Sequence, residues 1–511
     1  MGISARPRTH TAGIASSEPT THGVQVVGLR GPKPVEIVIA LTALAAALRF
    51  GTLNVQSIWL DEAATMVLVH HGFGGMLSHL SSSESAPPLY YMLVWGWTKI
   101  FGAGPLGFRS FSALVGTLTI PVLYAAGRRI SPRVGLWAAA LATVNPAMYY
   151  YSQEARCYAL LILFSAIAFV LWQHALQAPD TRRLALWAGA SILALLTHYF
   201  AAFLFVPEAL ILARRIGWRR VWAPAGAVLC VGIALAPLAL SQRANGNTNW
   251  IEDTSLASRI GETAKQFVVG LYGPLEILSG LIVGLLAAGA LWLLRRRGNA
   301  RERRLARDIA LVAVTAIVLP LLLAATHLVD VFDGRNVIAA WVPWAVLIAA
   351  GLGSAGAGRT GLLLGTGLCI ISLAVITGIN LLPAYQRDNW RGAVQALPTR
   401  IANRVIVGER YASIPLSIYL PDVHTFTGSR TSTGELVFIG LRTQRSGRSP
   451  LPPVVPTHPP PGFRFAGIRR TSSYAISRFV SPQAASVTVR ALRDAIKEPT
   501  AEIILQRQDL P

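Results

Sequence analysis

Long apolar runs separated by short polar segments fill most of the chain. A membrane-spanning helix needs about 20 mostly apolar residues to cross roughly 30 Å of hydrocarbon. Eleven runs approach that length, the fifth and sixth being short: 36–53, 110–127, 134–151, 158–176, 185–198, 200–213, 221–240, 274–294, 309–327, 337–353 and 361–382. The pattern therefore predicts an α-helical polytopic membrane protein with about eleven spans.

One apolar segment, 88–101, is too short to be a span, and counting it as one would reverse the sidedness of every later loop. We expect it to be a helix that lies at the membrane interface. There its aromatic side chains would sit at headgroup level: Tyr90, Tyr91, Trp95 and Trp97.

The chain is 53% hydrophobic and only 14% charged, and its formal net charge is +22. In a soluble protein this charge would suggest a nucleic-acid partner, but here the arginines cluster in alternate loops between spans. With the amino terminus inside, these clusters fall in cytoplasmic loops, as the positive-inside rule requires. We therefore expect membrane lipid and no nucleic acid as a partner. The clusters include 128–133, 182–183, 214–220, 295–307 and Arg359.

The flanks differ from the apolar centre. Residues 1–34 are rich in Thr, Ser, Gly and Pro, which favours a disordered cytoplasmic tail. Residues 35–382 would form the transmembrane catalytic domain. Residues 383–511 alternate between helix-like and strand-like segments, which predicts a small α/β extracytoplasmic domain. The three cysteines lie in apolar runs without the spacing of a disulfide or zinc site.

Asp61 and Glu62 follow the first apolar run and would share the first outer loop with Glu84. A carboxylate there could accept a proton from an acceptor hydroxyl or amine, or hold a divalent cation. The alternative is a solvated loop in which an acidic residue caps a helix.

Topology places further polar residues on the same outer side. Arginine side chains there would suit a phosphate group, whose oxygens match their fork of donors. For Arg49 the alternative is that its side chain snorkels to the membrane interface. Glu154 and Arg156 could instead pair with each other, and His198 could be an interfacial packing residue and not a ligand. We predict a donor-phosphate or substrate cavity formed by Arg49, Glu84, Tyr90, Arg109, Gln153, Glu154, Arg156, His198 and Arg335.

Several blocks between about residue 37 and residue 176 occur in a recognisable order. They are Trp59-Leu60-Asp61-Glu62-Ala63, Pro87-Pro88-Leu89-Tyr90-Tyr91, Phe108-Arg109-Ser110-Phe111 and Tyr151-Ser152-Gln153-Glu154-Ala155-Arg156. Together they resemble bacterial family 39 membrane glycosyltransferases of the GT-C superfamily, akin to protein mannosyltransferases and the lipid A aminoarabinose transferase. Weaker likeness continues at Arg335 and at Asn389-Trp390-Arg391.

The resemblance implies a glycosyltransferase of the bacterial cytoplasmic membrane. Such an enzyme moves a sugar from a polyprenyl-phosphate carrier to a lipid, glycan or protein acceptor on the outer face. Asp61 would be the essential carboxylate, as a base or through a metal, with Glu62 beside it. No cofactor is certain, and a divalent cation is the open option. One departure is Ala86, because the aminoarabinose transferases carry a lysine immediately before the paired prolines.

Two other classes remain alternatives. A transporter or flippase of a lipid-linked sugar would also have many spans, but it would move its substrate without forming a covalent product. Such proteins commonly carry internal repeats, and none is evident here. An inactive scaffold would instead depend on residues 383–511 and be insensitive to substitution of Asp61.

Overall fold

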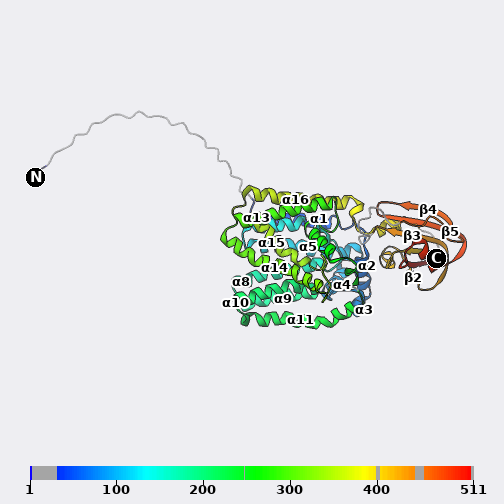
Figure 1. Cartoon of the computed structure of the whole chain (residues 1–511), viewed down its shortest axis with the longest axis horizontal. Coiled ribbons are helices and arrows are strands. Elements are labelled where there is room, and N and C mark those ends of the chain that lie inside the picture. The colour runs from blue at the N-terminus through cyan, green and yellow to red at the C-terminus, as the bar shows by residue number, and fades with distance from the viewer. Residues whose placement is uncertain (3–31, 247, 399–402, 443–453, 508–511) are drawn as a thin grey trace, which may run out of the picture. The chain divides into compact units, whose positions relative to one another are not determined.

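The computed structural model describes residues 1–2, 32–246, 248–398, 403–442 and 454–507. The expected disordered tail, 1–34, lies almost wholly outside these ranges. Residues Pro34–Pro511 form one compact unit, in which a helical bundle is followed by a C-terminal sheet (Figure 1). The fold class predicted from the hydrophobic pattern is confirmed.

The bundle begins with α1 (Pro34–Phe50), and three short helices come next. The helices that follow α1 are α2 (Leu60–His70), α3 (Gly72–Ser83), α4 (Leu89–Phe101), α5 (Pro105–Arg128), α6 (Pro132–Val144), α7 (Pro146–Ser152), α8 (Tyr158–Gln177), α9 (Thr181–Thr197), η1 (Tyr199–Ala201), α10 (Ala202–Ile216), α11 (Trp218–Ala244), η2 (Asn249–Ile251), α12 (Leu256–Val269), α13 (Glu276–Arg297), α14 (Ala300–Ala325), η3 (Ile338–Ala340), α15 (Trp341–Leu352) and α16 (Gly358–Leu381).

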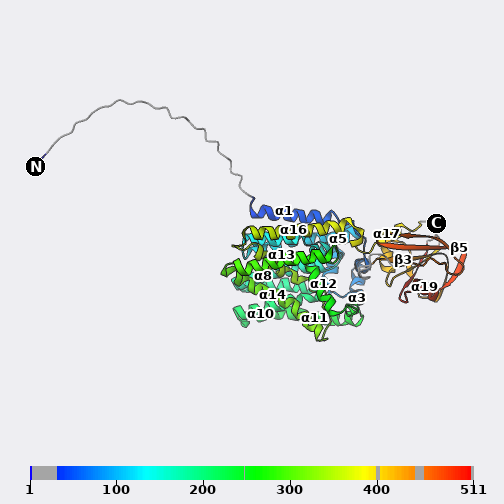
Figure 2. The ribbon, with the colours of Figure 1, turned by 45° about the horizontal axis from the view of Figure 1, so that its top comes forward.

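Among the described residues, 6 helices are long and apolar enough to cross a membrane: α5, α8, α11, α13, α14 and α16. The other predicted spans are also helical but shorter, such as α1 and α9 with 17 residues each and α10 with 15. Figure 2 shows these helices running side by side. The protein is therefore a multi-pass membrane protein, and the short apolar segment 88–101 is the separate helix α4.

The third predicted span, 134–151, is broken in two at Asn145-Pro146. Proline lacks a backbone N–H and is favoured at the first position of a helix. The Asn145 side chain accepts hydrogen bonds from the backbone N–H groups of Ala147 and Met148, at 3.0 and 3.1 Å, and so caps α7. The predicted span is thus two helices, α6 and the short α7. Helix α7 ends at Ser152, and a short turn then connects it to α8.

The C-terminal part is a mixed sheet with helices on both faces. Its strands are β1 (Asn403–Gly408), β2 (Val423–Thr425), β3 (Arg430–Leu441), β4 (Arg464–Arg470), β5 (Tyr474–Thr488) and β6 (Glu502–Arg507). They stand in the order β2-β6-β1-β3-β5-β4, and only the β1–β3 pair among these described strands is parallel. The remaining elements are η4 (Pro383–Tyr385), α17 (Trp390–Gln395), α18 (Ser413–Tyr419) and α19 (Val489–Ile496). Separate apolar clusters cover the two faces, so the predicted α/β domain is present.

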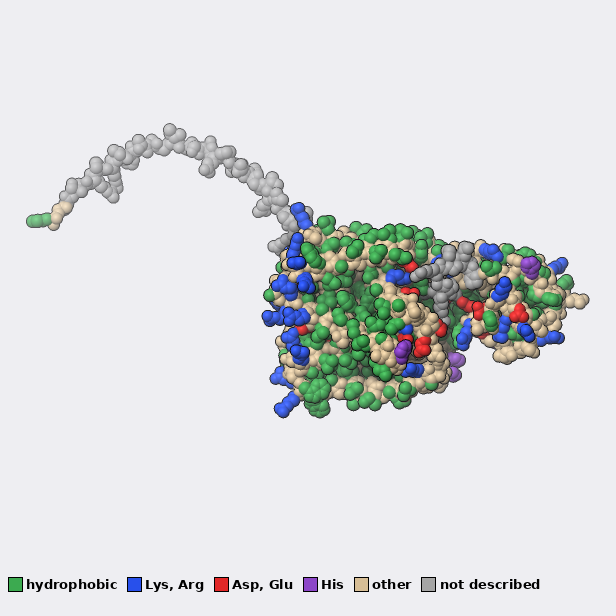
Figure 3. All heavy atoms as spheres, viewed as in Figure 1, with side chains coloured by type: hydrophobic (Ala, Val, Ile, Leu, Met, Phe, Trp, Pro, Cys, Tyr) green, Lys and Arg blue, Asp and Glu red, His purple; other side chains and the backbone are tan. Residues whose placement is uncertain are grey.

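Charge is distributed unevenly over the bundle. Figure 3 shows a hydrophobic surface between a rim of lysine and arginine side chains and the C-terminal sheet. The basic rim includes the last turns of α10 and α13, with Arg214, Arg215 and Arg295–Arg297. The end of the bundle that carries the sheet is therefore chemically different from the basic end.

Candidate active site

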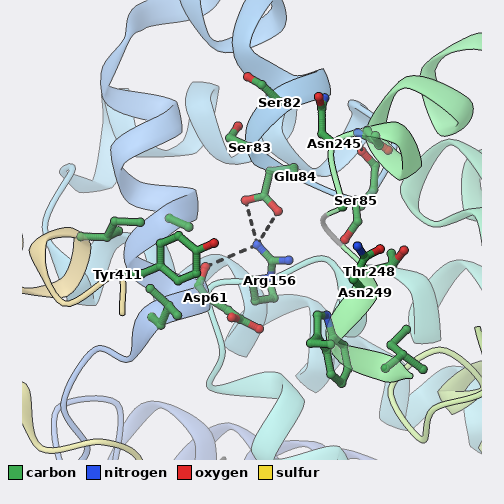
Figure 4. Close-up of a pocket in the computed structure, with 18 of the residues that line it drawn as sticks. Asp61, Ser82, Ser83, Glu84, Ser85, Arg156, Asn245, Thr248, Asn249 and Tyr411 are labelled. Carbon is green, nitrogen blue, oxygen red and sulfur yellow. Dashed lines mark hydrogen bonds and ion pairs between the residues drawn. The ribbon is translucent and has the colours of Figure 1, made fainter. Parts of the chain in front are cut away.

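A cavity of about 1430 Å³ lies where the bundle meets the C-terminal sheet. Its wall is formed by residues from the helical segments α2, α3 and α11, from the turns before α8 and after α9, and from the sheet domain. Five residues predicted from the sequence line it: Asp61, Glu84, Arg156, His198 and Arg335. Figure 4 shows Asp61, Glu84 and Arg156 grouped in this cavity.

Asp61 lies in the first turn of α2 and faces an arginine from a distant part of the chain. Arg335 Nη1 is 3.0 Å from Asp61 Oδ2, and the two side chains are 21% and 14% exposed. The Arg335 guanidinium also lies 4.5 Å from the centre of the Trp250 ring. Burial opposes the charge of Arg335, but Tyr158, Asp333 and Asp61 hold its pKa well above the usual arginine value. The Arg335 guanidinium is therefore the counter-charge of the Asp61 carboxylate.

Glu84 and Arg156 form a second pair on the same wall. Arg156 Nη1 donates to both carboxylate oxygens of Glu84, at 2.8 and 2.6 Å. The same nitrogen donates to Thr65 Oγ1 at 3.1 Å and to the backbone oxygen of Asp61 at 3.3 Å. Arg156 therefore links the carboxylate that ends α3 to the start of α2, next to Asp61 (Figure 4).

Glu62, the immediate neighbour of Asp61, faces the protein interior and is not among the described residues that line the cavity. Its side chain is fully buried, and it accepts hydrogen bonds from Arg109 Nε at 2.7 Å and Nη2 at 2.5 Å. Arg387 and the backbone N–H of Ala155 are further donors, at 3.4 and 2.9 Å. Burial alone would raise the pKa of Glu62, but Arg109 and Arg387 hold it below its ordinary value.

Four other predicted residues are also packed behind the cavity. Arg49 donates to the oxygens of Ala142 and Thr143, which the break between α6 and α7 leaves without helical partners. Gln153 donates to the backbone oxygen of Arg49 at 2.9 Å. The Tyr90 ring packs against Tyr91 and Phe111, and Arg109 is held by Glu62. None of these four is among the described lining residues.

Comparisons with known proteins agree with this architecture. Residues 85–241 match the family model described as "Dolichyl-phosphate-mannose-protein mannosyltransferase". The Cupriavidus metallidurans ArnT structure bound to undecaprenyl phosphate has a TM-score of 0.52 at 14% identity, covering 86% of this chain and 97% of that chain. The chain therefore has the fold of ArnT, a GT-C fold. No curated protein sequence matches this chain.

Two further solved structures are similar to this chain. The apo form of the same ArnT has a TM-score of 0.53 at 13% identity, again covering 86% of this chain and 97% of that chain. The Saccharomyces cerevisiae Pmt1-Pmt2 complex bound to the sugar donor has a TM-score of 0.32 at 19% identity, with coverages of 42% and 33%. The ArnT structures establish the fold, and neither they nor the matching family model support the transporter alternative.

The side chains of Glu154 and His198 are both buried, but their pKa values shift in opposite directions. Glu154 is 1% exposed, and its Oε2 atom has no hydrogen-bond partner among the described residues. Burial raises the pKa of Glu154 to about 7, although Arg387 and Arg335 oppose the rise. Burial, with Arg156 and Arg335 nearby, lowers the pKa of His198 to about 3. His198 is therefore a neutral imidazole on the cavity wall, and Glu154 is a carboxyl that titrates near neutral pH.

Sequence reasoning missed Arg387 and Trp250. Arg387 lies 4.2 Å from the centre of the Tyr150 ring and donates to the backbone oxygens of Gln153 and Tyr150, at 3.0 and 3.1 Å. The sequence did contain a signal for Arg387. It follows the last predicted span on the side of the membrane where the predicted loops contain few arginines, so an arginine there is unusual. Trp250 offered no such signal, because only its contact with Arg335 distinguishes it.

The carboxylates of the cavity are the candidates for metal ligands. Over the described ranges, no group of three or more His, Cys, Asp and Glu side chains is placed to hold a metal ion. Asp61 and Glu84 each face an arginine instead, so a cation at either carboxylate would have to displace a guanidinium. The metal role of Asp61 stays a prediction.

Proposed function

We propose that this GT-C enzyme transfers a sugar from a polyprenyl-phosphate carrier to an acceptor, with Asp61 as the catalytic base. The observation that carries the proposal is the pairing of Asp61 with Arg335 beside Glu84 and Arg156, in one cavity at the end of the bundle. A carrier of this kind is an amphiphile, so its chain must stay in lipid while its headgroup enters a polar site. The ArnT structure with bound undecaprenyl phosphate supports this class of donor.

The reaction takes place, in this proposal, on the outer face of a bacterial cytoplasmic membrane. Cytoplasmic loops carry an excess of arginine and lysine, and the basic rim of the bundle lies away from the C-terminal sheet (Figure 3). The cavity and the domain 383–511 would then be extracytoplasmic, and the span domain 35–382 would carry the chemistry.

The residues of the cavity suggest a single displacement. An acceptor oxygen or nitrogen attacks the anomeric carbon while its proton passes to the Asp61 carboxylate. The bond between the anomeric carbon and the phosphate oxygen breaks, and its electron pair leaves with the phosphate. Arg335 and Arg156 would stabilise the negative charge of that leaving group. Such a displacement inverts the anomeric centre.

Glu62 is assigned a different task from Asp61. With Arg109, Arg387 and the Ala155 N–H as donors, it fixes the first turn of α2 against the segment before α8. Successive residues of a helix are about 100° apart around its axis, so holding Glu62 inward directs Asp61 toward the cavity. Glu62 is therefore proposed as a positioning residue.

Asp61→Asn tests the proposal, because the amide keeps the shape of the side chain and removes the base. We expect transfer to fall by about 10²- to 10⁴-fold, the usual contribution of general acid–base catalysis. The assay uses the purified full chain with polyprenyl-phosphate-linked mannose, glucose, arabinose and aminoarabinose, and thermal melting checks the fold. Asp308→Asn, at an ion pair on the opposite end of the bundle, is the matched control.

A near wild-type rate in well-folded Asp61→Asn protein would contradict the role of Asp61. If deletion of 383–511 then abolished function, the scaffold alternative would be favoured. Addition of a chelator distinguishes the two roles of Asp61. Transfer should continue if Asp61 acts as a base, and it should stop if Asp61 acts by binding a metal ion.

A further inference from the structure

The cavity has a second wall that comes from the C-terminal domain. The loop between β1 and α18 contributes Arg410 and Tyr411 to the lining, and Ile439, Glu498 and Thr500 come from elsewhere in the domain. This wall faces the carboxylate–arginine pairs of the bundle across one continuous space. A substrate in the cavity would therefore meet both parts of the protein.

Tyr411 is the prominent side chain of this second wall. It is 44% exposed, and the Arg410 guanidinium lies 4.7 Å from the centre of its ring. Its backbone φ is +70°, in the left-handed region that bulky residues rarely adopt and that Gly and Asn tolerate better. In Figure 4 the ring projects into the cavity on the side of Asp61.

The loop is held in place relative to Asp61. At the far end of α18, the Tyr419 hydroxyl accepts a hydrogen bond from the Ile58 N–H at 2.8 Å, just before α2. Arg391, at the start of α17, donates to Asn54 Oδ1 at 2.8 Å and to the Val55 oxygen at 3.1 Å. The Tyr411 ring therefore belongs to a wall that is fastened to the segment carrying the proposed base.

We propose that Tyr411, with Arg410 beside it, is a stacking platform for a sugar ring of the acceptor, so that the acceptor is a saccharide. The proposal rests on the function proposed above. A pyranose ring has an apolar face of C–H groups and a rim of hydroxyls, which suits an exposed aromatic ring flanked by a planar polar group.

The other polar groups of the cavity fit the same class of acceptor. Ser83, Ser85, Asn245 and Asn249 line the cavity (Figure 4) and offer neutral hydroxyl and amide groups to sugar hydroxyls. Asp61 and Glu84 already face arginines, so the site is not built around a cationic ligand.

The location of Tyr411 in the C-terminal domain indicates that its ring contacts the acceptor and not the donor. The lipid chain of a donor must lie along the hydrocarbon-facing bundle, where Arg156 and Arg335 are placed to bind its phosphate. The C-terminal domain stands beyond that end of the bundle (Figure 1). A water-borne or headgroup saccharide that approaches Asp61 from that side therefore passes Tyr411.

Tyr411→Asn is the decisive variant, because asparagine accepts the left-handed backbone and removes the ring. We expect the KM for a saccharide acceptor to rise by about tenfold, equivalent to the loss of one ring-stacking contact. The rise in the KM for acceptor should exceed any change in the KM for donor. Tyr411→Phe should retain acceptor binding, and Phe465→Ala, a similarly exposed aromatic ring outside the cavity, should behave as wild type.

The probes are methyl mannoside, glucoside and galactoside, their disaccharides, and a peptide rich in serine and threonine. Saturation-transfer NMR on the full chain without donor measures saccharide binding directly. Absence of transfer from every donor, with Tyr411-dependent saccharide binding, would contradict the proposed function and support this inference. Unchanged saccharide binding in Tyr411→Asn, or transfer to the peptide in preference to saccharides, would overturn the inference alone.

Discussion

Asp61 and Glu62 are adjacent in the sequence and are placed in opposite environments. Asp61 lies on the wall of a large cavity, paired with an arginine that is itself partly exposed. Glu62 is sealed in the interior and receives donors from Arg109, Arg387 and a backbone N–H. One carboxylate can meet a substrate, whereas the other holds together segments that are far apart in the chain.

The difference shows how a membrane enzyme can stabilise a charged site beside lipid. Unpaired buried charges are costly, so the interior network around Glu62 matches its carboxylate with several donors. The ion pairs of the cavity, Asp61–Arg335 and Glu84–Arg156, can remain partly solvated because they lie at the end of the bundle. Substitutions in each network test whether stability and catalysis are separated in this way.

Arg109→Ala should have the largest effect on stability. It leaves Glu62 buried with a weaker partner, Arg387 at 3.4 Å, and removes the donor to the oxygens of Leu53 and Gln56. Breaking a buried ion pair from one side costs about 3–5 kcal/mol. We expect a large fall in the melting temperature and in the yield of monodisperse protein in detergent.

Arg215→Ala is the matched control, since Arg215 pairs with Asp308 but its side chain is 47% exposed. Exposed pairs contribute about 0–1 kcal/mol, so its melting temperature should barely change. Equal losses in the two variants would mean that the interior network has no special structural role.

The contrast between the two carboxylates also separates what the sequence could predict from what it could not. Hydrophobic runs located the apolar helices, the separate short helix α4 and the change to a sheet domain, because these depend on local pattern. The pattern placed Asp61 and Glu62 together but could not assign their directions, since the phase of the short helix α2 is set by tertiary contacts. The contact between Glu62 and Arg387 joins positions 325 residues apart, and no local pattern encodes such a pairing.

Glu154→Gln should change how stability depends on pH. The pKa of Glu154 is raised from 4.5 to about 7, so between these values the native protein keeps a proton that the unfolded chain has lost. Wild-type stability must then fall as pH rises through this window, and glutamine removes that loss. The melting temperature of the variant relative to wild type should therefore increase from pH 4.5 to 7, reflecting a few kcal/mol.

Glu252→Gln, which removes an exposed carboxylate, is the control for the loss of a negative charge at the protein surface. If the difference in melting temperature between Glu154→Gln and wild type did not change with pH, the Glu154 carboxyl would be ionised over the whole range. Glu154 would then be a permanently charged residue of the interior, like Glu62.

Tyr419→Phe should have the smallest effect and tests the contact between the sheet domain and the segment before Asp61. Its hydroxyl accepts a hydrogen bond from the fully buried Ile58 N–H at 2.8 Å. Leaving that donor unsatisfied costs about 1–3 kcal/mol, so we expect a modest fall in melting temperature. Ser417→Ala, on the same helix, removes only a local bond to the Ile414 oxygen and is the control. If Tyr419→Phe raised the acceptor KM as well, the hydroxyl would also align the Tyr411 loop with the cavity. If neither the melting temperature nor the acceptor KM changed, the contact between the two parts would rest on apolar packing and on other polar contacts, such as those of Arg387 and Arg391.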